Sequence, residues 1–109
     1  MDDTELIVGY STDATIKDRL KTMEKFDLIY IDGSHDYIDV ISDIDLANEC
    51  LRPAGFLVLD DASSRINLGT SPKFWGHEDV AQAIDDKLID NDNYKHLMAL
   101  GHNRVFKKL

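Results

Sequence analysis

Two short apolar segments, each followed directly by acidic residues, restrict this chain more than any other feature of its sequence. Residues 26–31 (Phe-Asp-Leu-Ile-Tyr-Ile) lead into Asp32, and residues 56–59 (Phe-Leu-Val-Leu) lead into Asp60 and Asp61. Short runs that are β-rich and nearly all apolar are typical of strands buried on both faces of a parallel sheet. The sequence therefore predicts two buried strands, each of which ends in acid.

The rest of the chain alternates between helical and extended patterns. Strands are predicted at residues 5–10, 26–31, 56–59, 94–100 and 104–108, and helices at residues 14–25, 37–51 and 77–90. This βαβαβαββ order predicts an α/β fold with a mostly parallel sheet, helices on both faces and a closing antiparallel hairpin. Residues 62–76 have no clear period and are predicted to form a long functional or partner-facing loop.

Length and composition fit a single globular domain over residues 1–109. This length leaves little room for a second domain, and a hydrophobic content of 43% is ordinary for a folded chain. No apolar run approaches the roughly 20 residues that span a bilayer, and the first residues lack the pattern of a secretory signal. Cys50 is the single cysteine, which excludes an internal disulfide and favours a reducing, cytoplasmic location.

The charge of the chain points away from nucleic acid as a partner. The net charge is −9, whereas phosphate binding needs a basic face. Nine acidic side chains and one basic side chain, Arg52, lie within residues 26–62. Part of this excess is typical of a solvated helix face, and the remainder lies at the strand ends, where packing does not require charge.

The acidic strand ends predict a cation site. Ligands of open parallel sheets bind at the carboxyl ends of the strands, and paired strands lie roughly 4.8 Å apart. Asp32, Asp60 and Asp61 would then converge and repel one another unless a cation or a proton intervened, and Mg²⁺ suits such oxygen ligands. His35 follows Asp32 by three residues and could act as a general base.

A structural interpretation of the same residues stays open. Asp32 could satisfy backbone amides of the next helix, Asp60 and Asp61 could position the following loop, and His35 could be a turn residue.

Other chemistries lack their motifs. The sequence has no cysteine cluster for zinc, no Gly-x-Ser-x-Gly, no Gly-x-x-x-x-Gly-Lys and no Gly-x-Gly-x-x-Gly. The remaining histidines and large aromatic residues are interpreted as structural. His77 begins a helix, His96 alternates within a strand, His102 lies in a turn, and Phe74 and Trp75 are hydrophobic anchors or interface residues.

The two acidic strand ends and their flanks resemble a known family. Ile31-Asp32-Gly33-Ser34-His35, with a tyrosine two residues later, is followed by Leu51-x-Pro-x-Gly55, four apolar residues and two aspartates. Together these motifs resemble the class I S-adenosylmethionine-dependent methyltransferases, in particular their metal-dependent O-methyltransferase branch. The resemblance extends from about Ile7 to Leu109 and implies a Rossmann-like, methyltransferase-type sheet.

The resemblance implies a role for each candidate residue. Asp32, Asp60 and Asp61 correspond to ligands of Mg²⁺ or a similar divalent cation. His35 corresponds to the base that takes a proton from the hydroxyl of a small-molecule acceptor. Ser11 and Asp13, together with Asp32, correspond to positions that contact S-adenosylmethionine.

The chain also departs from this family. The first two strands and the glycine-rich cofactor loop are absent, so the chain resembles the second half of the domain and cofactor affinity is expected to be weak or lost. The strand at residues 26–31 would be left with an open side, which Leu6–Val8, a second copy or a partner chain would cover. The chain could also be a fragment of a longer gene product. Three functions follow as expectations: a truncated methyltransferase, a non-catalytic interaction or oligomerisation module on the same half-fold, and a cation-dependent enzyme of another class, such as a phosphate-transfer protein.

Overall fold

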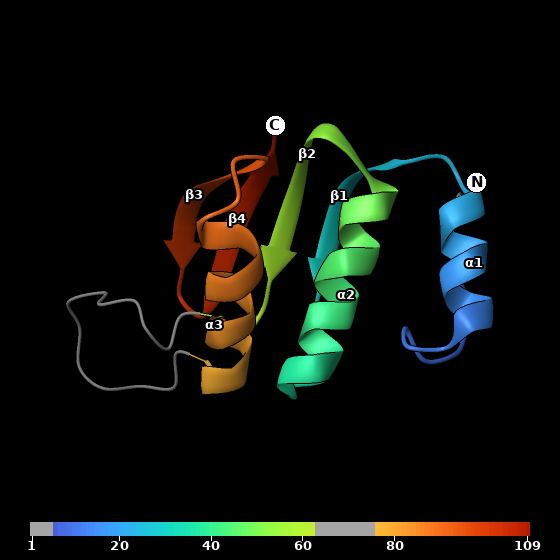
Figure 1. The fold of residues 1–109 in the computed structure, drawn as a ribbon, viewed down its shortest axis with the longest axis horizontal. Coiled ribbons are helices and arrows are strands. Elements are labelled where there is room, and N and C mark those ends of the chain that lie inside the picture. The colour runs from blue at the N-terminus through green and yellow to red at the C-terminus, as the bar shows by residue number, and fades with distance from the viewer. Residues whose placement is uncertain (1–5, 63–75) are drawn as a thin grey trace.

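The computed structural model describes residues 6–62 and 76–109, which form one layer of helices against one sheet (Figure 1). In chain order the elements are α1 (Ala14–Thr22), β1 (Phe26–Ile31), α2 (Tyr37–Cys50), β2 (Leu51–Leu59), α3 (Glu78–Ile84), the π-helical turn η1 (Asp85–Ile89), β3 (Tyr94–Leu100) and β4 (Asn103–Lys108). The predicted α/β class and the closing hairpin are confirmed.

The sheet is mixed, with strand order β1-β2-β4-β3. β1 and β2 pair in parallel, as predicted, while β4 pairs antiparallel with both β2 and β3. The expectation of a mostly parallel sheet therefore holds for a single pair among the described strands. The hairpin adds an antiparallel edge to the sheet by pairing β4 with β2. This pairing places the start of β4 beside the carboxyl end of β2, with Arg104 opposite Leu59.

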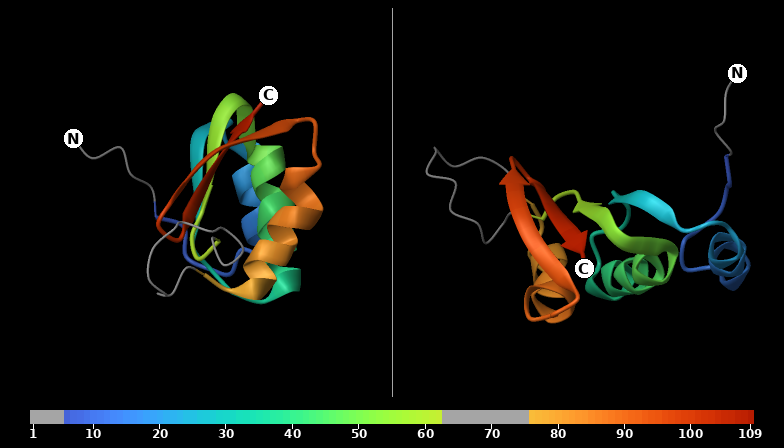
Figure 2. Two further views of the ribbon diagram at one scale, coloured as in Figure 1. Left: turned by 90° about the vertical axis from the view of Figure 1, so that its left-hand side faces the viewer. Right: turned by 90° about the horizontal axis from the view of Figure 1, so that it is seen from above.

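The helices lie on one face of the sheet. In Figure 2 the sheet stands to one side of α2 and α3, and α1 lies beyond the edge at β1 on that same side. The predicted helices on both faces are thus not found in the described residues. The side chains of β1 and β2 that point away from α2, among them Leu28 and Phe56, are exposed to solvent.

The predicted strand at residues 5–10 is wrong for its described part. Leu6, Val8 and Tyr10 lie in an irregular segment and are each more than three-quarters exposed. A strand needs a neighbour to pair with. This segment instead runs past α1, where Gly9 lies against Ile16. β1 consequently has a free edge among the described residues, as expected for a sheet without Leu6–Val8.

The helices match their predicted positions with small shifts. α1 ends at Thr22, three residues early, where the amide of Met23 donates to the carbonyl of Leu20. β2 begins at Leu51, earlier than predicted, because Leu51 is fully buried and pairs with Phe26. The predicted helix at 77–90 is divided into α3 and η1.

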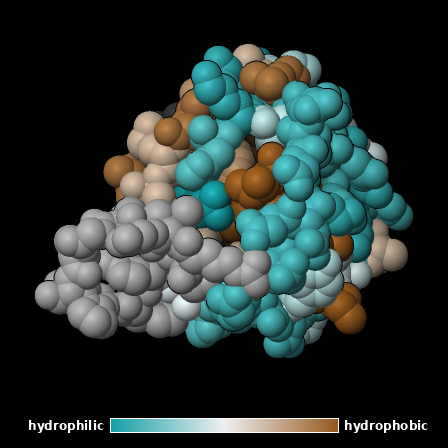
Figure 3. All heavy atoms as spheres, turned by 60° about the vertical axis from the view of Figure 1, so that its left-hand side comes forward, coloured by the Kyte–Doolittle hydropathy of each residue, from teal (hydrophilic) through white to brown (hydrophobic). Residues whose placement is uncertain are grey.

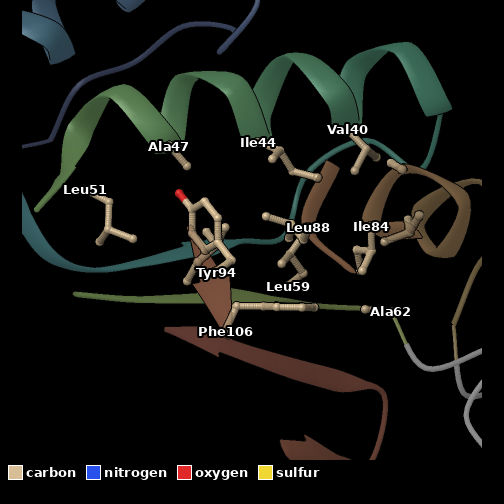
Figure 4. Close-up of a cluster of buried hydrophobic side chains, with 13 residues drawn as sticks. Val40, Ile44, Ala47, Leu51, Leu59, Ala62, Ile84, Leu88, Tyr94 and Phe106 are labelled. Atoms are coloured by element: carbon tan, nitrogen blue, oxygen red, sulfur yellow. The ribbon is translucent and has the colours of Figure 1, made fainter. Parts of the chain in front are cut away.

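The core lies between α2, α3 and the helix-facing side of the sheet. Figure 4 shows Val40, Ile44 and Ala47 of α2 directed at the sheet, with Leu59 and Phe106 beneath them. Leu57, Leu59, Ile84 and Phe106 are completely buried. This packing fixes β2 against α2, and so fixes the strand end at which Asp60 and Asp61 emerge.

Candidate functional site

The two acidic strand ends meet, as the sequence predicts. The parallel register sets Ile31 opposite Leu59, and the amide of Asp60 donates to the carbonyl of Ile31 at 3.0 Å, one step beyond the last strand residue. Asp32 and Asp60 therefore stand side by side, and their side chains share a hydrogen bond.

The pKa values of these two carboxyl groups are shifted in opposite directions. The hydrogen bond to Asp60 and the negative charge of Asp60 raise the pKa of Asp32. Burial works against the ionisation of Asp60, but hydrogen bonds from Asp32 and His102 outweigh it and the pKa of Asp60 is lowered. Asp32 is thus the weaker acid of the pair, and Asp60 ionises first as the pH rises.

Asp61 turns its carboxylate toward two imidazoles. His35 Nε2 lies 2.9 Å from Asp61 Oδ2, and His102 Nδ1 lies 3.4 Å from Asp61 Oδ1. Asp61 adopts a left-handed backbone conformation, with φ of 55°, which is uncommon outside glycine and recurs at functional sites. The structure therefore brings His35 to the carboxylates, where the sequence placed it.

Two further histidines belong to the same site. His77 caps the start of α3, as predicted, and its ring stacks on His35 with centroids 3.7 Å apart. His102 lies in the hairpin turn, as predicted, and its Nδ1 is 2.8 Å from Asp60 Oδ1. From the sequence, both histidines are interpreted as structural and are not identified as site residues. The hairpin offered a signal for His102, because a last strand that pairs antiparallel with β2 must begin beside Asp60.

The close approach of residues 76–77 to Asp61 depends on a glycine. Ala62 and Gly76 form an isolated bridge, and the amide of His77 donates to the carbonyl of Asp61 at 2.9 Å. A Cβ on Gly76 would overlap the backbone of Asp61, and Gly76 has φ of 150°. Only glycine fits this contact without rearrangement.

The predicted cofactor residues lie along the free edge of β1. Ser11 and Asp32 line one cavity of about 340 Å³, which has apolar walls from β1 and α2 and a hydrogen bond of 2.6 Å from Ser11 Oγ to Asp43. Asp13 is the residue before α1 and does not line this cavity. Their assignment to cofactor binding stays a prediction.

The donor sets decide which ions the site could hold. Among the described residues, two groups of side chains have their ligand atoms within 4.8 Å of one another: Asp60, Asp61 and His102, and His35, Asp61 and His77. Asp32 lies beside Asp60 but belongs to neither group. Oxygen donors suit Mg²⁺ and similar hard ions, so the aspartates fit the predicted cation.

Phe74 and Trp75 and most of the predicted loop at 62–76 lie outside the described residues. Among the residues that are described, no helix has the length and apolar character needed to cross a membrane.

Comparisons with known proteins support the resemblance to methyltransferases. A solved structure described as "a putative O-methyltransferase from Klebsiella pneumoniae" matches with a TM-score of 0.54 at 17% sequence identity. The match covers 84% of this chain but only 45% of that one, and at such low identity it shows the fold alone. No curated protein matches the sequence. A family model of the methyltransferase domain matches residues 2–62, more than half of the chain. The chain therefore belongs to this methyltransferase domain family.

Proposed function

We propose that this chain carries the cation-binding and acceptor-binding part of an S-adenosylmethionine-dependent O-methyltransferase that acts on a small-molecule hydroxyl. The observation that carries the proposal is that Asp32 meets Asp60, and His35 meets Asp61, at the end of the β1–β2 pair. Membership of the methyltransferase family supports the reaction class.

The aspartates would hold the cation. The raised pKa of Asp32, caused first by its hydrogen bond with Asp60 and then by the charge of Asp60, reflects two carboxyl groups whose charges repel each other. A divalent cation would relieve this repulsion. When bound, such an ion supplies positive charge that lowers the pKa of a nearby hydroxyl and orients it.

His35 would act as the base. A carboxylate only accepts hydrogen bonds, so in the neutral imidazole the hydrogen lies on Nε2, toward Asp61 at 2.9 Å, and Nδ1 keeps its lone pair. Nδ1 would take the proton of the acceptor hydroxyl, and Asp61 would stabilise the imidazolium that forms. His35 is about half exposed, which leaves room for an acceptor to reach it.

The cofactor would occupy the cavity at the free edge of β1. Its volume lies at the lower end of the range of small-molecule sites, and apolar walls with a few polar groups suit an adenosyl group. S-adenosylmethionine supplies the methyl group when bound. The printed sequence holds no glycine-rich turn to contact the rest of the cofactor, so we expect weak binding.

Calorimetric titration of S-adenosylhomocysteine into the purified chain tests the proposal, once with Mg²⁺ and once with EDTA. We expect binding that depends on Mg²⁺ and is lost in Asp60→Asn. Asp92→Asn, which removes the same charge from the exposed turn before β3, is the matched control and should bind normally. Equal binding by Asp60→Asn would refute a role for the aspartates. Binding of Mg²⁺ without S-adenosylhomocysteine would favour a cation-dependent enzyme of another class.

An interaction module is the second candidate, and the uncovered face of the sheet favours it. Leu28 and Tyr30 of β1 are 56% and 49% exposed, and the neighbouring Phe56 of β2 is 38% exposed. A chain that binds S-adenosylhomocysteine in neither buffer but self-associates through this face would be such a module.

A further inference from the structure

We propose that His35, Asp61 and His77 form a second cation site, which takes a borderline transition-metal ion of the Zn²⁺ class. The site lies beside the aspartate set, shares Asp61 with it and draws its two nitrogen ligands from different elements. It stands on the positions of these three side chains and does not require the proposed methyl transfer.

The spacing of the three side chains matches a coordination site. Their ligand atoms all lie within 4.8 Å of one another. Bonds of about 2.0–2.2 Å to one tetrahedral ion hold neighbouring ligand atoms roughly 3.3–3.6 Å apart. His35 Nε2 and Asp61 Oδ2 lie 2.9 Å apart, so these two atoms would have to separate by about half an ångström for an ion to enter.

Each ligand has a defined backbone position. His35 lies in the turn between β1 and α2, and Asp61 follows β2 in its left-handed conformation. His77 is held by its own amide, which donates to Asp61, and its carbonyl accepts from Ala81 in the first turn of α3. Ligands fixed in this way lose little conformational entropy on binding an ion.

The donor set selects the kind of ion. Imidazole nitrogen is a good ligand for Zn²⁺, Fe²⁺, Co²⁺ and Ni²⁺, whereas Mg²⁺ prefers oxygen. Two imidazoles and one carboxylate leave a coordination position for water, as in catalytic zinc sites. His35 is exposed and the other two residues are half-buried, so solvent can reach the ion.

Binding at this site would change what His35 can do. The ion would take the lone pair of Nε2, and the hydrogen now on Nε2 would move to Nδ1 through exchange with solvent. Nδ1 could then no longer accept a proton. Occupation by the transition-metal ion and action of His35 as a base are therefore mutually exclusive.

Titration of the purified full chain with Zn²⁺ against a chromophoric chelator tests the site. We expect His77→Ala to weaken Zn²⁺ binding by at least about 100-fold, the upper end of the loss caused by removing an outer partner of a ligand. His96→Ala is the matched control, because His96 lies on β3 beside Phe106 and should leave the affinity unchanged. Unchanged affinity in His77→Ala, or a loss in His102→Ala instead, would overturn the proposal.

A measurement on the unaltered chain guards against a variant that fails to fold. Paramagnetic Co²⁺ should broaden the imidazole proton resonances of His35 and His77 at lower ion concentration than those of His96. Simultaneous broadening of all the histidines would show unspecific binding and refute the site. The Mg²⁺-dependent titration of S-adenosylhomocysteine is measured separately on the unaltered chain, so the two proposals fail separately.

Discussion

The two faces of the sheet are built from alternate residues of the same strands, yet they have opposite environments. Leu57 and Leu59 of β2 are fully buried under α2. Phe56, the residue before Leu57, points away from α2 and is partly exposed. On β1 the half-buried Ile29 packs toward the core, and its neighbours Leu28 and Tyr30 are open to solvent. Figure 3 shows brown and tan atoms at the surface on the sheet side, while the helix side is mostly teal.

The difference teaches that an apolar strand is not by itself a buried strand. The apolar runs at residues 26–31 and 56–59 predicted strands buried on both faces of the sheet, but the described residues cover only one of these faces. An exposed apolar face of this kind marks an interaction surface or an association hazard. The contrast between the covered and the open face can be tested at matched positions.

The largest effect is expected from Phe106→Ala on the covered face. Phe106 is completely buried in the core, and such truncations cost about 3–5 kcal/mol of unfolding free energy. Phe56→Ala on the open face should cost less than half as much, because part of that ring is already in water. Urea denaturation followed by circular dichroism measures both. Similar costs would mean that something covers the open face in solution.

Removing apolar surface from the open face should weaken association between copies of the chain. In a solution of the purified chain, a second copy can cover Leu28 and Phe56. We expect Leu28→Ser to raise the dissociation constant of the self-associated form about tenfold, which is about 1.4 kcal/mol. Sedimentation velocity over a range of concentrations gives this constant. Ile38→Ser, at an exposed position of α2 on the helix side, is a control for a change in general solubility, and an equal effect there would contradict a specific interface.

Two tyrosines, one on each face of the sheet, allow the two faces to be compared by removing a single hydroxyl group. Tyr94 on the covered face is buried and donates to Asn48 Oδ1 at 2.8 Å, so Tyr94→Phe should cost roughly 1 kcal/mol. Tyr30 on the open face is exposed and makes a longer bond of 3.3 Å to Asn103. Tyr30→Phe should change the unfolding free energy very little. Equal costs in thermal or urea unfolding would argue against this contrast.

The smallest effects are expected at the end of the sheet, where the acidic pair lies and both faces meet. The lowered pKa of Asp60 contributes stability that is present above the unfolded pKa of about 4 and is lost as the pH falls through the folded value. The raised pKa of Asp32 has the opposite sign: its contribution is present at low pH and is lost as the pH rises through the folded value.

Replacing each carboxyl group by an amide should separate the two opposite pH dependences of stability. Asp60→Asn should lower stability at neutral pH and reduce the loss of stability in acid. Asp32→Asn should not lower stability at neutral pH, because an amide can still donate to Asp60 and cannot ionise. Unfolding curves from pH 3 to 7 test this, and a neutral-pH loss in Asp32→Asn equal to that in Asp60→Asn would contradict the opposite directions of the two pKa shifts.

Much of this protein could be predicted from local sequence. The β-rich runs at 26–31 and 56–59, the helical period between them and the hairpin around Gly101 give the elements of the α/β fold. The parallel pairing of the first two strands then brings Asp32 next to Asp60, and His35 follows at the adjacent turn. These features depend on side-chain periodicity and on neighbours close in sequence, which the sequence itself records.

The tertiary structure decided the rest. Leu6–Val8 looks like a strand but has no partner there, and the helices gather on one face because α2 and α3 bury the same side of β2 and β4. His77 follows His35 by 42 residues, and His102 follows Asp60 by 42 residues. They join the site because Gly76 permits a close backbone contact and because β4 returns beside β2. Packing between distant segments, rather than local propensity, sets these positions. The sequence alone therefore named the aspartates and His35, whereas only the tertiary structure added His77 and His102 to the site.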